Sequence, residues 1–303
     1  MQRVVVRTLP DGSVRNVRPF HVCLKGLEDA VLCREDEDCD VMVKVICISA
    51  RRCNVIVIIY AVVSNHCHIA VLAASQEDAD RYGQDIKKVY SMFFSRKYGE
   101  RGILRRVEMK ALPLENDWHT RNVLAYIPRN ALDNGGPVDE YKWSGYRAMF
   151  RDKKPEWTFP VSMMKSRDKE RILHTGESVK GVAWVVNRDG ELEPFSFCDS
   201  AYLEQVFNGK QSFFLQCIGG VNTTEMAFNL EVRPYTMVTD AEFLKSVEEL
   251  SRNWFKCPIS ALSQEQRARI IYYVRKTHKT STSQLARVFR LPRSIITQIL
   301  GKK

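Results

Sequence analysis

The stretch that decides the fold is NVIVIIYAVVSNHCHIAVL, residues 54–72. Residues 55–62 form a continuous apolar run rich in β-branched side chains, which is typical of a strand buried on both faces. Ser64 and Asn65 then predict a tight reversal, so that residues 66–72 are the second strand of a hairpin. Successive side chains of a strand point to opposite faces, so His66 and His68 share one face and Cys67 takes the other.

The segments that flank this hairpin alternate between strand and helix patterns. The order along the chain is strand, helix, two strands, helix, strand, helix. This order predicts an α+β protein with a ferredoxin-like antiparallel sheet, the layout also used by RNA-recognition (RRM-like) modules. The expected flanking elements are strands at 18–26 and 105–111 and helices at 35–52, 76–98 and 116–130, the last with Val123, Leu124 and Ile127 toward the core.

The composition describes a protein with a substantial core and no membrane segment. At 303 residues and 45% apolar content, the chain is long enough for two domains or for one large domain with an appendage. Its longest apolar runs are far shorter than the roughly 20 residues that span a bilayer, and the N-terminus lacks a signal-peptide pattern. The nine cysteines include no Cys-x-x-Cys pair, so we expect reduced thiols in a cytoplasmic protein and no structural zinc site.

The positive charge of the chain is concentrated at its C-terminal end. The net charge is +10, and residues 257–303 contain ten Lys and Arg side chains against a single acid, Glu265. A basic segment beside a nearly neutral body suggests a nucleic-acid-binding unit, with a merely solvated basic end as the alternative. Residues 263–277, a short helix capped by Ser281 or Thr282, and a last helix opened by Pro292 together predict a helix-turn-helix unit, or else a small bundle for protein contacts.

The last helix is expected to bury three isoleucines and to present short polar and cationic side chains to base edges. Lysines of the 76–98 helix could in addition follow a DNA backbone, although charges on a helix are often only a solvated face. The expected buried set is Ile295, Ile296 and Ile299. The expected DNA-contacting side chains are Arg293, Ser294, Thr297 and Gln298, with Arg287, Arg290, Lys87 and Lys88 as further candidates.

A tyrosine and an amide stand four residues apart in the 116–130 helix, so Tyr126 and Asn130 share a face. The chain can therefore present two imidazoles from a sheet and a phenol and an amide from a helix. A tyrosine hydroxyl has a pKa near 10, so it attacks only when its target is activated or its proton is removed. This set of groups suits a metal-assisted attack by tyrosine on a phosphodiester.

Three motifs, SNHCH (64–68), YIPRN (126–130) and YKWSGY (141–146), resemble those of the single-tyrosine HUH-endonuclease transposases. Within that group the chain is most similar to the REP-associated tyrosine transposases, over about residues 18–150. The resemblance implies that Tyr126 attacks single-stranded DNA, forming a 5′-phosphotyrosine and releasing a 3′-hydroxyl that can reverse the step. It also implies that His66, His68 and Asn130 hold Mg²⁺ or Mn²⁺, at a site that could also take zinc.

The chain departs from the family pattern at three positions. Cys67 replaces a bulkier hydrophobic residue between the histidines, and Ser64 replaces a proline that is common before the asparagine. Pro128 lies between Tyr126 and Asn130, where it removes a helical hydrogen bond. We expect Pro128 to kink the helix and to shift Asn130 relative to Tyr126.

The sequence thus predicts a catalytic domain at 1–150, a mixed α/β extension at 151–256 and a basic DNA-binding domain at 257–303. The preferred function is cleavage and rejoining of single-stranded or hairpin DNA by a monomer or homodimer, with duplex DNA as a further partner of the C-terminal domain. One alternative is a catalytically retired DNA-binding regulator that acts through its helix-turn-helix. Another is a nickase of the replication-initiator or relaxase kind.

Overall fold

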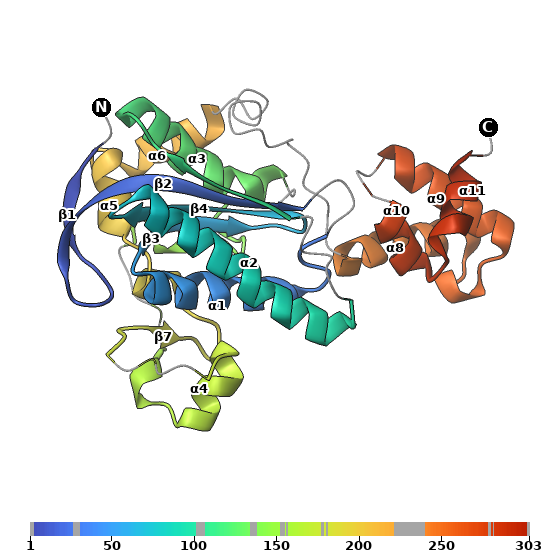
Figure 1. The fold of residues 1–303 in the computed structure, drawn as a ribbon. Helices are drawn as coiled ribbons and strands as arrows, with labels where there is room; N and C mark the ends of the chain where they lie inside the picture. The colour runs from blue at the N-terminus through green and yellow to red at the C-terminus, as the bar shows by residue number, and fades with distance from the viewer. Residues whose placement is uncertain are drawn as a thin grey trace.

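The computed structural model shows an α+β protein with a curled antiparallel sheet, which confirms the predicted class (Figure 1). Helices cover both faces of the sheet, and a further group of helices follows at the C-terminal end. The described residues are 3–26, 31–100, 107–133, 138–151, 155, 157–176, 179, 181–220, 240–277, 280 and 282–301.

The sheet is built around β2 (Val14–Gly26), which pairs with β4 (His66–Ala73) on one side and with β5 (Val107–Pro113) on the other. β3 (Ile56–Val62) pairs with β4, and all of these pairings are antiparallel. The order β5-β2-β4-β3 is that of the connectivity predicted from the sequence. The first residues of β2 also pair with β1 (Val5–Thr8), a hairpin that the sequence analysis did not anticipate.

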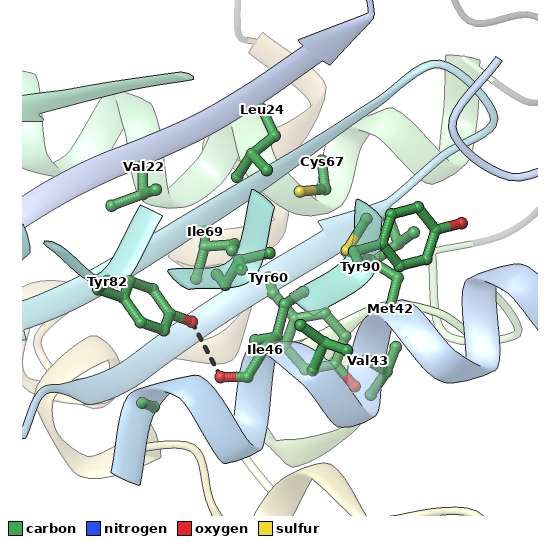
Figure 2. Close-up of a cluster of buried hydrophobic side chains, with 14 of the residues drawn as sticks. Val22, Leu24, Met42, Val43, Ile46, Tyr60, Cys67, Ile69, Tyr82 and Tyr90 are labelled. Atoms are coloured by element: carbon green, nitrogen blue, oxygen red, sulfur yellow. Dashed lines mark hydrogen bonds between the residues drawn. The ribbon is translucent and has the colours of Figure 1, made fainter. Parts of the chain in front are cut away.

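One face of the sheet packs against α1 (Asp36–Cys53) and α2 (Gln76–Tyr98). Figure 2 shows this dry core, in which Leu24 and Ile69 of the sheet face Ile46 and Tyr82 of the helices. The Tyr82 hydroxyl donates a hydrogen bond of 3.1 Å to the Ile46 carbonyl, so this large ring is buried without an unpaired polar group. Burial of this apolar face is the main stabilising contribution from the two helices.

The opposite face packs against α3 (Asp117–Asp133), α5 (Ser200–Val206) and α6 (Gln211–Gly220). Val123, Leu124 and Ile127 of α3 are fully buried, as expected. Arg129 donates a hydrogen bond of 2.7 Å to the Ile218 carbonyl and so holds the end of α6 against α3. Part of the predicted 151–256 extension therefore completes the core on the histidine-bearing side.

The YKWSGY segment covers the outer edge of β3. The Val62 amide donates to the Trp143 carbonyl at 2.9 Å, and farther along the strand the Asp199 amide donates to the Val57 carbonyl at 2.8 Å. A side chain on Gly145 would place its Cβ 3.0 Å from the Tyr60 backbone nitrogen, so any larger residue here would press on the backbone of β3. The segment therefore satisfies backbone groups of an edge strand that would otherwise be unpaired.

A small lobe lies against α1 through Cys47 and Ile48. It contains β6 (Phe159–Pro160), α4 (Ser166–Leu173) and β7 (Val185–Val186). Short 3-10 turns lie at Gly145–Ala148, Val161–Met163, Pro194–Ser196 and Ile259–Ala261.

The C-terminal group consists of α8 (Asp240–Phe255), α9 (Gln264–Thr277), α10 (Thr282–Phe289) and α11 (Arg293–Gly301) around its own core. α8 lies before residue 257 yet packs into that core through Phe243 and Val247. The expectation for Ile295 is wrong, because its side chain is 39% exposed. Neighbours in a helix point about 100° apart, so a nine-residue helix that buries Ile296 turns Ile295 toward solvent.

All nine cysteines are free thiols, and six of them are buried, as expected of cysteines that act as small core residues. Cys67 packs on the α1–α2 side of the sheet, opposite the two histidines that flank it. Within the described ranges, no helix is both long enough and apolar enough to cross a membrane.

Candidate active site

The histidines of β4 and the polar residues of α3 meet on one face of the sheet. The ring centroids of His66 and His68 are 4.8 Å apart, and those of His68 and Tyr126 are 5.1 Å apart. Asn130 Oδ1 lies 3.1 Å from His66 Nε2. The fold therefore brings together all four residues predicted for the catalytic centre, and all four are buried, Tyr126 with 2% of its surface exposed.

The Asn130 amide is held in one orientation by its own helix. Its Nδ2 donates to the carbonyls of Tyr126 at 3.2 Å and Ile127 at 2.9 Å, which turns Oδ1 toward His66. α3 continues through Pro128, and Asn130 lies within hydrogen-bond distance of His66. Pro128 cannot donate a backbone hydrogen bond within the helix, yet Asn130 still lies next to His66.

The surroundings of His66 place two oxygen atoms at its two ring nitrogens. Nδ1 lies 2.7 Å from Asn65 Oδ1, while Nε2 faces Asn130 Oδ1. A neutral imidazole carries one N–H and can donate to only one of these oxygens. When Nδ1 donates over the shorter distance, the Nε2 lone pair and the Asn130 oxygen face each other, an arrangement that a cation complements.

The predicted ligand atoms fit a small divalent cation. Adjacent ligands of an octahedral Mg²⁺ with bonds of about 2.1 Å lie about 3.0 Å apart, close to the separation of His66 Nε2 and Asn130 Oδ1. His68 Nε2 is buried and has no hydrogen-bond partner among the described residues, so a lone pair is available there. Among the residues that the structure describes, no group of three His, Cys, Asp or Glu side chains is arranged to hold a metal ion. The Asn130 amide oxygen is therefore needed as the third ligand beside His66 and His68.

A third histidine, His21 of β2, belongs to this cluster and was not predicted. His21 Nε2 lies 3.0 Å from His68 Nδ1, and the two rings are stacked with centroids 5.0 Å apart. Both side chains are fully buried. If His68 Nδ1 donates this hydrogen bond, the His68 Nε2 lone pair is kept for a ligand, which is how partners of metal-binding histidines usually act.

The sequence predicts that His21 lies in a strand, but it does not predict that His21 lies beside His68. The strand pattern at 18–26 placed the residue in a strand, but its position beside His68 depends on the register between β2 and β4. In that register His21 lies opposite Ala70 and Cys23 lies opposite His68, so His21 is a diagonal neighbour of His68. Nothing local in either strand specifies this offset.

Burial keeps the imidazoles uncharged at neutral pH. Desolvation lowers the pKa of His21 to about 3 and, opposed by the Asn130 hydrogen bond, lowers the pKa of His66 to about 4. The pKa of His68 is also held well below its usual value, first by burial and then by the neighbouring imidazoles. Neutral imidazole is the form that binds metal ions, so burial prepares these side chains as ligands.

The predicted DNA-contacting residues of the C-terminal group fall into two sets. Arg293, Ser294, Thr297 and Gln298 are exposed along α11, and Arg290 is exposed in the turn before it. Arg287 instead pairs with Asp240 of α8, with Nε 2.6 Å from Oδ2, and so joins α10 to α8.

The two predicted lysines of α2 lie far from the histidines. α2 covers the opposite face of the sheet, so Lys87 and Lys88 are separated from Tyr126 by the sheet itself. Lys87 donates a hydrogen bond of 2.6 Å to the Val107 carbonyl, while Lys88 is exposed.

Comparisons with protein-family models, with curated proteins and with solved structures find no match to this chain.

Proposed function

We propose that the protein is a metal-dependent DNA-cleaving and DNA-joining enzyme of the HUH type that uses Tyr126 as its nucleophile. The observation that carries the proposal is the meeting of His66, His68, Asn130 and Tyr126, which come from two separate segments, on one face of the sheet. A phenol beside two neutral imidazoles and an oriented amide oxygen is the set of groups that this chemistry requires.

His66, His68 and Asn130 would hold Mg²⁺ or Mn²⁺, which when bound neutralises charge that develops on the scissile phosphate. Tyr126 Oη loses its proton to solvent and forms a bond to phosphorus while the bond to the 3′ oxygen breaks, and the released 3′ oxygen takes up a proton to become a hydroxyl. Because the phosphotyrosine keeps the energy of the broken ester, the reverse step rejoins DNA without an external energy source.

The C-terminal group would supply affinity for hairpin or duplex DNA as a helix-turn-helix. Its support is the exposed row of Arg293, Ser294, Thr297 and Gln298 on α11, in a segment that carries most of the net charge of the chain. Short polar and cationic side chains at the start of such a helix suit contacts with base edges and phosphates.

The decisive experiment mixes the full chain with labelled single-stranded oligonucleotides that contain a hairpin, in Mn²⁺, Mg²⁺ or EDTA. We expect a covalent protein–DNA adduct that requires metal, is lost in Tyr126→Phe and persists in Tyr82→Phe, a control at a buried tyrosine on the other face. An adduct that persists in Tyr126→Phe would contradict the proposal.

A DNA-binding regulator without catalytic activity is the second candidate, and one observation favours it. Tyr126 is only 2% exposed and the predicted metal ligands are buried, whereas the polar row on α11 is open to solvent. Strong binding of the same oligonucleotides without an adduct in either metal ion would leave this function in place of the first.

A further inference from the structure

Helix α3 covers only part of the histidine-bearing face. It packs over β3 and β4, whose residues are nearly all buried. Over β2 and β5 the same face is more open within the described part of the chain, because Lys25, Lys110 and Leu112 are partly exposed and Glu108 is exposed. An open strip, formed by Lys25 of β2 and by Glu108, Lys110 and Leu112 of β5, therefore runs beside the buried histidines, while Cys23 of β2 is buried.

The strand register places positive charge in this open strip. Lys25 lies opposite His66 on β4 and opposite Glu108 on β5. In the next row, Cys23 lies opposite His68 and Lys110. Residues directly opposite each other in antiparallel strands share a face, so each lysine stands in the same row as one of the predicted metal ligands.

We propose that the open strip binds the backbone of a single DNA strand, with Lys25 and Lys110 contacting its phosphates as the strand reaches Tyr126. This inference rests on the proposed function, because it assigns the approach of that enzyme's substrate. The charges are complementary, and the strand register places the strip beside the candidate site. It is two strands wide, with axes about 5 Å apart, which suits one extended backbone rather than a duplex.

The existing partner of Lys110 does not prevent this role. Lys110 Nζ lies 3.3 Å from Glu108 Oε1, and the two side chains are 31% and 44% exposed. Such a solvated ion pair contributes little to stability, so a phosphate can replace the carboxylate at small cost. Glu108 opposes DNA binding in this arrangement, which makes its removal an informative variant.

The test measures binding of a fluorescein-labelled oligo-dT 12-mer by the full chain, in EDTA and over a range of salt concentrations. For the double variant Lys25→Gln/Lys110→Gln we expect about tenfold weaker binding at low salt and a salt slope smaller by about 1.4, the value for two phosphate contacts to a single strand. Glu108→Gln should tighten binding. The matched control, Lys165→Gln/Lys169→Gln, removes two charges from the small lobe and should leave affinity and slope unchanged.

An affinity and a slope for Lys25→Gln/Lys110→Gln equal to those of the control would overturn the inference, provided that thermal melting shows both variants to be folded. The inference would equally fail if Lys87→Gln/Lys88→Gln weakened binding instead, since the strand would then follow the other face. Because EDTA excludes metal-dependent chemistry, this result is independent of adduct formation. Lysine-dependent binding together with the absence of an adduct in Mn²⁺ would support the binding strip and refute the proposed enzyme.

Discussion

The two faces of the sheet are made by alternate residues of the same strands, yet they differ in chemistry. Toward α1 and α2 the strands β2 and β4 present Val22, Leu24, Cys67 and Ile69. Toward α3 they present His21, Cys23, Lys25, His66 and His68. One face is a dry core and the other holds a polar cluster, so adjacent positions in a strand should respond in opposite ways to substitution.

Substitutions of adjacent residues of β4 should show the largest difference in stability between the two faces of the sheet. Ile69→Ala removes buried methyl groups from the dry core, and we expect the free energy of unfolding to fall by about 2–5 kcal/mol. His21→Leu/His68→Leu replaces both partners of the buried imidazole pair by apolar side chains of similar volume, so its cost should stay within about 1 kcal/mol. Urea unfolding measures both values, and equal losses would show that the polar face is as important for stability as the apolar one.

Acidification should destabilise the protein through the polar face. A histidine whose folded-state pKa is depressed binds its proton more readily when unfolded, so the free energy of unfolding rises with pH up to 6.5 and falls on acidification. With the pKa of His66 at about 4, this side chain alone should account for a loss of about 2 kcal/mol between pH 6.5 and pH 5.

The measurement compares urea unfolding at the two pH values for the wild type and His66→Gln, whose dependence on pH should be flatter. His174→Gln, at an exposed histidine that follows α4 in the small lobe, serves as the control and should keep most of the wild-type dependence. If His66→Gln kept the full dependence, the protons would be taken up elsewhere.

Substitution of His21 tests whether a residue outside the predicted metal ligands positions His68 for metal binding. His21→Leu leaves His68 Nδ1 without an acceptor, so we expect Mn²⁺ affinity to fall about tenfold, as for other partners of metal-binding histidines. His21→Gln offers an amide oxygen in place of the imidazole and should retain most of the affinity. Calorimetric titration with Mn²⁺ gives the affinities.

Nitrogen NMR of the metal-free variants tests the same idea independently of metal binding. His68 should carry its proton on Nδ1 in the wild type and in His21→Gln, and should lose this preference in His21→Leu. The same tautomer of His68 in all three proteins would rule out a positioning role for His21.

The elements of the fold were largely predictable because local patterns specify them. The run at 55–62 predicts β3, and the apolar stripe at 76–98 gives α2 with the bounds that the structure shows. Ser75 caps the start of α2, because its side chain accepts from the Asp78 amide, and Gly99 caps its end in the left-handed conformation. The short β1 and the two-residue β7 carry no comparable local signal, because tertiary pairing defines them.

The candidate site was predictable only where its residues belong to motifs. His66 and His68 share a face by strand alternation, and Tyr126 and Asn130 share one by helical spacing, so each pair follows from local geometry. His21 belongs to the site because of the register between β2 and β4. Lys87 does not belong to it because α2 covers the opposite face of the sheet. Both are long-range properties, set by packing rather than by neighbouring residues.

The smallest expected difference compares one tyrosine from each face. Tyr82→Phe removes the hydroxyl that donates to the Ile46 carbonyl in the dry core, so we expect a loss of about 1 kcal/mol in the free energy of unfolding and no change in adduct formation. Tyr126→Phe should abolish the adduct, and its effect on stability is expected to be no larger than that of Tyr82→Phe. Parallel urea unfolding and adduct assays on the two variants decide the matter. If Tyr82→Phe also abolished the adduct, then the two faces would be coupled, and stability and chemistry could not be assigned to separate sides of the sheet.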